Sequence, residues 1–412
     1  MASDFTVDRA SKKYVLGSDG FLKEYANDAP AIEFNADGSY KGVLVEPESV
    51  NESKASEDLD NGTYWTPANT TIAGDTETDP KGGTNSFLLS EDATNSFHTF
   101  VTASAQRPSI ASGETWTQSV FVKKGDGANA PDIVQLTHGT AGFGTQYANF
   151  DISVGGGTSG TVTASSGGTA GIRYYANGWY RISWTATSTG ADDAFIVLVL
   201  VNNNPTAGRL PSYAGQTDAN VFVWGAQVEE SPIATSYIPT PVVGGTSSSV
   251  TRVKDDIYLT SASSLIGQTE GTLFIEVDWQ EASSATITQT LLSAHYDVDN
   301  RIKIYKDTDD YLNMFVQEGG GATEYDDGVD ASAYTGIQKI AFAYDNGDVE
   351  LYVNGSSVKS GTPSLSGFAS PLANVEFAQD YNADNQANMW IRAVALFTTR
   401  LSDAKCEDLT TI

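Results

Sequence analysis

The residues best suited to chemistry are the acidic ones in Glu276-Val-Asp-Trp-Gln-Glu281. Two glutamates this close in sequence could serve as the nucleophile and the general acid of glycoside hydrolysis. In an extended strand, however, Glu276 and Asp278 share one face and Glu281 lies on the other, unless a bulge intervenes. The stretch therefore favours an amphipathic strand, and we assign no catalytic residue. The residues expected to face the core are Leu273, Ile275, Val277 and Trp279.

A second acidic stretch, Asp380-Tyr-Asn-Ala-Asp-Asn-Gln386, has the residue types of a calcium site. It places oxygen-bearing side chains at alternate positions, Asp380, Asn382 and Asp384, and calcium prefers oxygen ligands. The stretch lacks the glycine and the distal glutamate of a helix–loop–helix calcium site. The sequence therefore favours a solvated acidic loop and no cofactor, with a bound calcium as the alternative.

The other reactive side chains form no motif. His98, His138 and His295 have neither the HxH nor the HExxH spacing of a zinc site. Cys406 is the only cysteine, which excludes an intrachain disulfide. We expect it to pack as a small residue in a closing helix.

Aromatic side chains often line ligand sites. Tyr325 and Tyr381 fall in acidic stretches that we expect to be loops, and they are the candidates for ligand contacts. Four tryptophans lie instead in runs that alternate between apolar and polar residues, which predicts that they belong to the core. These are Trp116, Trp179, Trp184 and Trp224.

The elements that must position these residues are strands. Short apolar runs separated by Gly, Asn, Asp and Ser recur along the chain, which is typical of strands joined by turns. Asp19-Gly20, Asp37-Gly38 and Asn354-Gly355 predict tight hairpins, because glycine tolerates a positive φ. One helix is predicted at 401–409, with Ser402 as its N-cap. The predicted strands include 115–124, 179–186, 194–201, 220–229, 273–279, 291–295, 301–305, 312–316, 338–344, 349–353, 375–378 and 389–397.

The predicted fold class is all-β, with two tandem antiparallel β-sandwiches and an extended N-terminal leader. The leader, residues 1–60, has too few strands for a core of its own, so we expect it to dock onto the rest. The first sandwich covers residues 61–240 and the second covers residues 255–412. Residues 241–254 are predicted to be a linker, because Gly-Gly and small polar residues bury little apolar area.

Charge and hydropathy restrict the partners. The chain has 52 acidic and 23 basic residues and a net charge of −29, which disfavours nucleic acid and anionic membrane surfaces. No apolar run has the length of a membrane span, so we expect no membrane insertion. The start, Met1-Ala-Ser-Asp-Phe5, lacks the basic and apolar regions of a secretory signal.

Seven short fragments in a fixed order provide a resemblance. They are Val7–Val15, Gly42–Glu46, Ser119–Lys123, Asn177–Ile182, Trp224–Glu230, Ala234–Pro239 and Val250–Asp255. Together they resemble a family of phage tail-fibre and virion-surface proteins that have a jelly roll like that of carbohydrate-binding modules. Each fragment is weak by itself, whereas the ordered set is more specific.

The rest of the chain resembles the concanavalin-like and laminin-G superfamily. The residues that carry this resemblance are Glu270–Leu273, Val349–Gly355 and Ala393–Ser402. That superfamily contains lectins, adhesion modules and glycosidases, so the fold alone does not fix the function.

These resemblances imply a non-enzymatic structural protein of a bacteriophage virion, either a tail fibre or a decoration protein on the capsid surface. It would be made in the host cytoplasm, assemble with other virion proteins and attach to host-surface polysaccharide, with a trimer as the family expectation. We expect the second sandwich to carry recognition, because ligand contacts often lie on loops and its loops are acidic. Two alternatives stay open: a virion polysaccharide depolymerase that uses Glu276 and Glu281, and a capsid cement or spacer protein.

Overall fold

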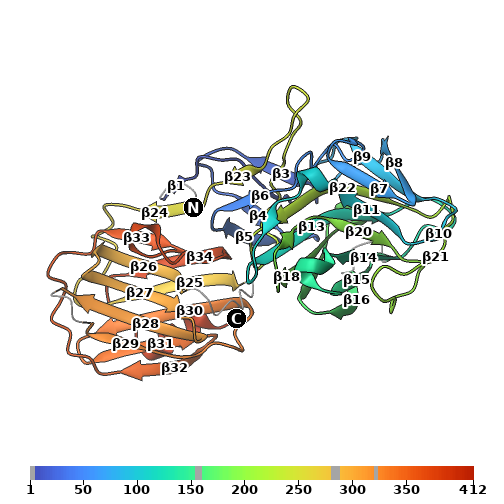
Figure 1. Cartoon of the computed structure of the whole chain (residues 1–412). Coiled ribbons are helices and arrows are strands. Elements are labelled where there is room, and N and C mark those ends of the chain that lie inside the picture. The colour runs from blue at the N-terminus through green and yellow to red at the C-terminus, as the bar shows by residue number, and fades with distance from the viewer. Residues whose placement is uncertain (1–4, 154–159, 280–287, 320–322) are drawn as a thin grey trace.

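The computed structural model describes residues 5–153, 160–279, 288–319 and 323–412. Strands dominate these residues and pair into two sandwiches that lie side by side (Figure 1). The α-helices in the described part of the chain are short: α1 (Thr140–Phe143) and α2 (Asp403–Thr410). The prediction of an all-β fold is confirmed. None of the helices in these ranges is both long and apolar enough to span a membrane.

The first sandwich packs two six-stranded antiparallel sheets face to face. One sheet has the order β16 (Thr161–Ser166), β15 (Tyr147–Asp151), β14 (Ile133–Thr137), β20 (Val197–Leu200), β11 (His98–Thr102) and β7 (Trp65–Ala68). The other has the order β17 (Thr169–Tyr174), β18 (Trp179–Thr187), β13 (Thr115–Lys124), β22 (Asn220–Glu229), β9 (Ser86–Glu91) and β8 (Thr70–Asp75). The four tryptophans predicted to be core residues are at most 5% exposed, which confirms that prediction.

The second sandwich packs two seven-stranded antiparallel sheets. One sheet has the order β1 (Thr6–Asp8), β24 (Asp256–Leu259), β33 (Asn374–Phe377), β26 (Gln289–Asp297), β27 (Asn300–Lys306), β28 (Tyr311–Glu318) and β29 (Tyr325–Asp330). The other has the order β32 (Ser356–Gly361), β31 (Asp348–Val353), β30 (Gly336–Asp345), β25 (Gly271–Trp279), β34 (Met389–Phe397), β5 (Tyr40–Val45) and β4 (Ile32–Phe34). Cys406 is fully buried in α2, as predicted, whereas the Ser402 side chain makes no capping hydrogen bond.

Short strand pairs complete the structure. Two belong to the first sandwich: β10 (Asn95–Ser96) with β21 (Tyr213–Ala214), and β12 (Ser109–Ile110) with β19 (Asp192–Asp193). The other two involve the N-terminal segment: β2 (Lys13–Leu16) with β3 (Leu22–Tyr25), and β6 (Ser49–Asn51) with β23 (Val250–Arg252).

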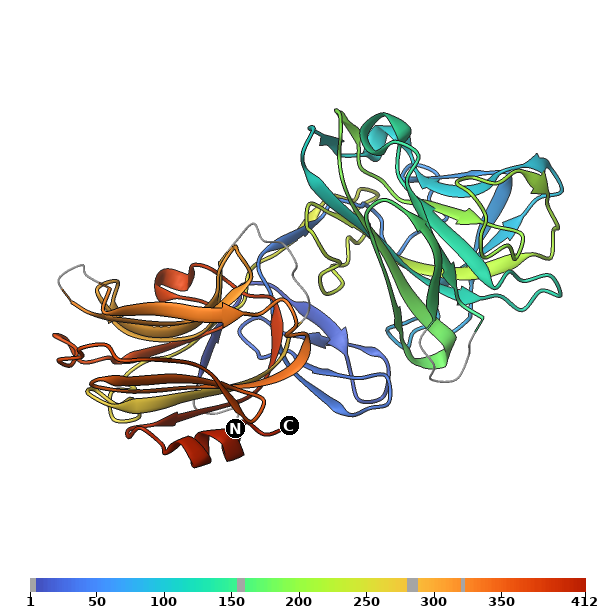
Figure 2. The ribbon, with the colours of Figure 1, turned by 90° about the horizontal axis from the view of Figure 1, so that it is seen from below.

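The N-terminal segment is not an extended leader in the structure. Strands β1, β4 and β5 join the sheets of the second sandwich, because Val7 and Val45 have their apolar partners in its core. The β2–β3 hairpin packs instead on the outer face of the first sandwich, where Leu16 and Leu22 meet Trp179. Figure 2 shows the blue N-terminal strands on the side of the red and orange sandwich that faces the green one. Residues 5–51 therefore hold the two sandwiches together.

A buried cluster of charges lies where these segments meet. The Asp255 carboxylate accepts hydrogen bonds from Arg9 Nη1 at 2.7 Å and from Lys13 Nζ at 2.5 Å. Lys13 Nζ also lies 2.9 Å from Glu46 Oε2, which is 3.8 Å from Arg252 Nη2. Burial alone would raise the pKa of Glu46, but Arg252 and Lys13 outweigh it and lower that pKa to about 2. We call these five residues the charge clamp.

The first part of the predicted linker, 241–254, is largely exposed, whereas its end is packed against the rest of the chain. Val243 is 71% exposed, and Gly244 and Gly245 form an open turn, seen as the yellow loop that projects in Figure 1. Its end is fixed, because β23 pairs with β6 and Arg252 is buried in the charge clamp.

Cleavage of the Val243–Gly245 turn by proteinase K should yield two fragments that stay together in native size-exclusion chromatography. The reason is that the N-terminal fragment supplies β1, β4 and β5 to the second sandwich. In Asp255→Asn the fragments should separate at a lower urea concentration, because that change leaves Arg9 buried without its carboxylate and Lys13 with Glu46 alone. Fragments that elute separately without denaturant would contradict this prediction.

A second prediction concerns His138, which stacks between Phe143 and Trp184 in the first sandwich. Burial lowers its pKa to about 3, so between pH 6.5 and 3 the unfolded chain binds a proton that the folded chain excludes. The free energy of unfolding should therefore fall as the pH drops, by up to about 1.4 kcal/mol per pH unit. In His138→Leu this slope should be shallower in urea titrations. At pH 8 the difference in the free energy of unfolding between the two proteins measures the packing effect of the substitution alone. Equal slopes of that free energy against pH below pH 6.5 would show that His138 does not cause the pH dependence.

Candidate functional site

Strands β17 and β18 present a polar outer face because their residues alternate. Ile172, Ile182 and Trp184 point into the core of the first sandwich, which leaves their sequence neighbours on the other side of the sheet. In register, these outer residues form three cross-strand pairs: Thr169 with Thr185, Gly171 with Ser183, and Arg173 with Arg181.

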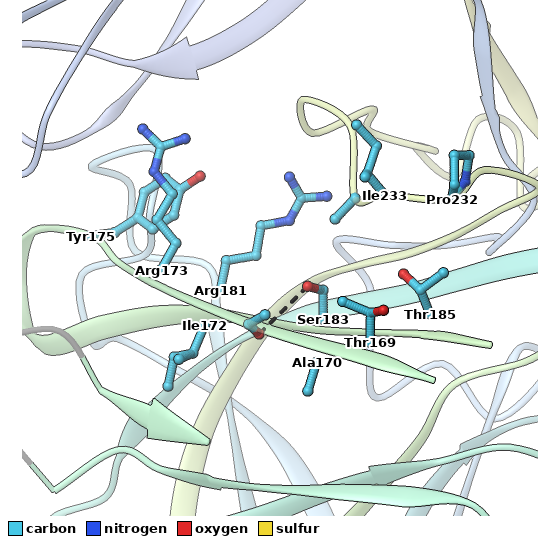
Figure 3. Close-up of a pocket in the computed structure, with 12 residues that line it drawn as sticks. Thr169, Ala170, Ile172, Arg173, Tyr175, Arg181, Ser183, Thr185, Pro232 and Ile233 are labelled. Atoms are coloured by element: carbon cyan, nitrogen blue, oxygen red, sulfur yellow. Dashed lines mark hydrogen bonds between the residues drawn. The ribbon is translucent and has the colours of Figure 1, made fainter. Parts of the chain in front are cut away.

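A groove of about 330 Å³ lies over these pairs (Figure 3). Its floor is formed by the outer residues of β17 and β18, and Pro232, Ile233 and Ala234 form its wall. Figure 3 shows Arg173 and Arg181 standing up from the sheet, with Arg181 between Arg173 and that wall. In the part of the chain that the structure describes, its lining contains no Asp, Glu, His or Lys. The described lining residues are Thr169, Ala170, Gly171, Ile172, Arg173, Tyr175, Arg181, Ser183, Thr185, Pro232, Ile233 and Ala234.

Arg181 is the central charge of the groove. It is only 7% exposed, and its Nη1 donates to the Thr235 carbonyl at 2.6 Å while its Nη2 donates to Ser119 Oγ at 2.9 Å. Its Nε has no hydrogen-bond partner, and within the described residues no carboxylate forms an ion pair with it. A guanidinium carries five N–H donors, so three remain available after these two bonds.

Arg173, by contrast, is neutralised by a residue of the N-terminal segment. Its Nη1 lies 2.8 Å from Glu33 Oε1, and Glu33 also accepts a hydrogen bond from Trp390 Nε1 at 2.5 Å. Burial would lower the pKa of Arg173, but Glu33 more than compensates and raises it. Two arginines directly opposite each other repel, so this ion pair allows Arg173 and Arg181 to stand side by side. The second sandwich, through Trp390, thus helps to shape a groove on the first.

The hydroxyl-bearing end of the groove suits a polar ligand. Thr185 shares a 2.6 Å hydrogen bond with Thr117, and Ser183 Oγ lies 3.5 Å from the Gly171 carbonyl. Hydroxyls can both donate and accept, whereas the arginines only donate. The groove therefore offers hydrogen bonds at both ends with the apolar Ile233 beside them. Its described lining residues include no pair of carboxylates for acid–base catalysis.

The carboxylates first considered for catalysis lie elsewhere. Glu276 forms an ion pair with Arg392, with 2.8 Å between Oε1 and Nε, and Arg392 also donates to the carbonyl of Lys41. Glu281 lies outside the described residues. The expected amphipathic strand is confirmed as β25, whose core-facing residues are at most 4% exposed: Leu273, Ile275, Val277 and Trp279.

The stretch considered for calcium is organised around cations. Asp380 is buried, and its Oδ2 accepts hydrogen bonds from Arg301 Nη1 at 2.7 Å and Lys303 Nζ at 2.6 Å. Burial would raise the pKa of Asp380, but Lys303 and Arg301 hold it below its usual value. Asn382 and Asp384 are exposed. Two cations already balance the Asp380 charge, so these contacts give calcium no support, and the described residues contain no cluster of three acidic, His or Cys side chains suited to a metal.

The two tyrosines proposed for ligand contacts are half-buried and lie apart. Tyr381 packs edge-on against His295, with ring centroids 5.1 Å apart. Tyr325 begins strand β29 rather than lying in a loop, and its hydroxyl donates to the Ser360 carbonyl at 3.3 Å. Burial raises its pKa. Neither residue lines the groove.

Sequence reasoning missed the groove although its signal was present. The run Trp179–Thr187 alternates, and only its apolar set, which includes Ile182 and Trp184, was interpreted. The other set begins with Trp179 and continues with the polar Arg181, Ser183 and Thr185, and that polar part indicates an outer face available for contacts.

Comparisons with known proteins find only distantly similar solved structures. No family model matches the chain, and no curated protein matches it. A solved carbohydrate-binding module, CBM40 of Ruminococcus gnavus IT-sialidase, is 18% identical with a TM-score of 0.32, over 36% of this chain and 86% of that one. The receptor-binding domain of botulinum neurotoxin C/D mosaic serotype is 15% identical with a TM-score of 0.29, and the match covers 38% of this chain and 40% of that one. TM-scores of this size carry no argument, and the architecture described above depends on the strand pairing of this chain.

Asp380→Asn should destabilise the protein by about 3–5 kcal/mol, because it leaves the buried Lys303 and the partly buried Arg301 without their carboxylate. The exposed Asp384→Asn is the matched control and should change the free energy of unfolding by less than about 0.5 kcal/mol. Urea titrations measure both. EDTA and added calcium should leave the melting temperature unchanged. A melting temperature that rises with calcium in the unchanged protein, but not in Asp380→Asn, would instead identify a calcium site.

Proposed function

We propose that this chain is a non-enzymatic glycan-binding protein of a bacteriophage particle, and that the groove on β17 and β18 is its glycan site. The observation that carries the proposal is the composition of the groove: hydroxyls of Thr169, Ser183 and Thr185, two arginines, and an apolar wall. Sugars present many hydroxyls and some apolar C–H surface, so a glycan would find partners along the whole groove.

The charged residues that line the groove favour glycan binding without hydrolysis. Hydrolysis of a glycosidic bond by the usual route needs two carboxyl groups about 5–10 Å apart across the substrate. Among the described residues, none that lines the groove has a carboxyl group, and Glu276, the described member of the earlier pair, is engaged with Arg392. A depolymerase is therefore not the function that these contacts favour.

The virion part of the proposal depends on the seven sequence fragments that resemble phage tail-fibre and virion-surface proteins. Such a protein would assemble with other virion proteins, and several copies on one particle would turn weak glycan contacts into strong attachment. A trimer would present three grooves. The groove lies on the first sandwich, so we place recognition there rather than on the acidic loops of the second.

The test is a glycan array probed with the intact chain and with Thr169→Trp. Thr169 is exposed on the edge strand β17, so a tryptophan there should fill the groove and leave the fold intact. Binding should weaken by about tenfold or more, which corresponds to about 1.4 kcal/mol. Thr71→Trp is the matched control, because Thr71 is exposed on β8, the opposite edge of the same sheet.

Two results would contradict the proposal. Glycan binding that survives Thr169→Trp would place the glycan site elsewhere. Silence on the array together with tight binding to purified capsids would favour a cement or spacer protein.

A further inference from the structure

We infer that the glycan bound in the groove carries a carboxylate, that Arg181 is the residue that pairs with it, and that Glu33 limits the groove to one such charge. This inference rests on the proposed function, because it specifies the ligand of the same groove. It is drawn from how the charges near the groove are paired.

Arg181 differs from the other unpaired arginines of the chain. Within the described residues, Arg107, Arg181 and Arg209 form no ion pair with a carboxylate. Arg107 and Arg209 are partly exposed, so water can solvate them, whereas Arg181 is 7% exposed. A buried charge without a counter-ion is costly, and a ligand carboxylate would remove that cost.

The nearby carboxylates are already engaged. Glu33 pairs with Arg173, and Glu46 pairs with Lys13 and Arg252. Glu229 accepts hydrogen bonds from Ser49 Oγ at 2.6 Å and from the Thr235 amide at 3.0 Å. None of them forms an ion pair with Arg181, whose Nε also lacks a partner. The groove therefore holds one positive charge that has the Phe121 ring 5.5 Å away but no carboxylate partner among the described residues, in a protein whose net charge is −29.

The chemistry of a guanidinium favours a carboxylate over a neutral hydroxyl. Its planar N–H fork matches the two oxygens of a carboxylate, and such charge-assisted bonds are about twice as strong as neutral ones. The hydroxyls of Ser183 and Thr185 lie one and two positions further along the outer face of β18, where they would contact the hydroxyls of the same sugar. An acidic monosaccharide meets both requirements.

Glu33 sets how many negative charges the groove accepts. It neutralises Arg173, the cross-strand neighbour of Arg181, and it is held in place by Trp390 of the second sandwich. Glu33 is 2% exposed, so it acts on the ligand through Arg173 and is a positioning residue. Removing its charge would give the groove a second free guanidinium.

Calorimetric titration of the full chain tests this inference with uronic-acid oligosaccharides from pectin and alginate, each compared with its carboxyl-reduced form. Carboxyl reduction should weaken binding by about tenfold or more. Arg181→Lys keeps the charge and loses the fork, and it should weaken binding of the acidic form by about tenfold with little effect on the reduced form. Glu33→Gln should strengthen binding of the acidic form by about tenfold and make it more sensitive to salt. Arg209→Lys is the matched control, because it makes the same substitution in an arginine that does not line the groove, and it should change nothing.

The outcomes separate the inference from the proposed function. Suppose that neutral and acidic glycans bind equally well and that Thr169→Trp blocks both. That result would overturn the inference about the carboxylate and would leave the proposed glycan site standing. Equal binding of sulfated and carboxylated oligosaccharides would overturn the choice of a carboxylate. Circular dichroism checks that Arg181→Lys is folded, and if it is not, Glu33→Gln decides: unchanged or weaker binding of the acidic form would refute the role given to Glu33.

Discussion

The structure depends on one buried carboxylate, that of Asp255. It lies at the start of the second sandwich and receives Arg9 and Lys13 from the beginning of the chain. It also accepts the backbone amide of Glu46 at 2.9 Å. Burying charges in this way adds little stability compared with an apolar core, but once they are buried, each needs its partners. The charge clamp therefore adds little to stability, but it determines which segments must pack together. It makes the N-terminal segment part of both sandwiches.

The groove is a second consequence of the same arrangement. Because β4 and β5 belong to the second sandwich, Glu33 is carried to the face of the first, where it meets Arg173. An ion pair that crosses from one sandwich to the other makes the charge of the groove a property of the whole chain. The first sandwich alone would have the same hydroxyls but two opposed arginines.

Strand positions could be predicted from sequence, because period-two alternation is a local property. The runs at 115–124 and 220–229 have the bounds of β13 and β22, and the Asp-Gly hairpins are present. Pairing between distant segments could not be predicted, since nothing local in Thr6–Asp8 indicates that its partner is Asp256–Leu259. The same holds for Asp380, whose cations lie almost eighty residues earlier. The seven fragments that carry the phage resemblance lie close together in the structure. Three of them supply the charge clamp, and three supply Arg181 and its hydrogen-bond partners Ser119 and Thr235. The remaining fragment supplies Trp224 to the buried aromatic cluster that also contains Trp179.

The contribution of β1, β4 and β5 to the second sandwich has a consequence for synthesis on the ribosome. These strands emerge before the first sandwich, while their partners β24 and β34 emerge after the whole first sandwich has been made. Contacts so distant in sequence slow folding, and unpaired strand edges are prone to aggregation during the delay. The first sandwich can close early, apart from the residues it shares with the clamp. The second can close only when β34 has left the ribosome tunnel, so its early strands must wait for a partner that is made much later.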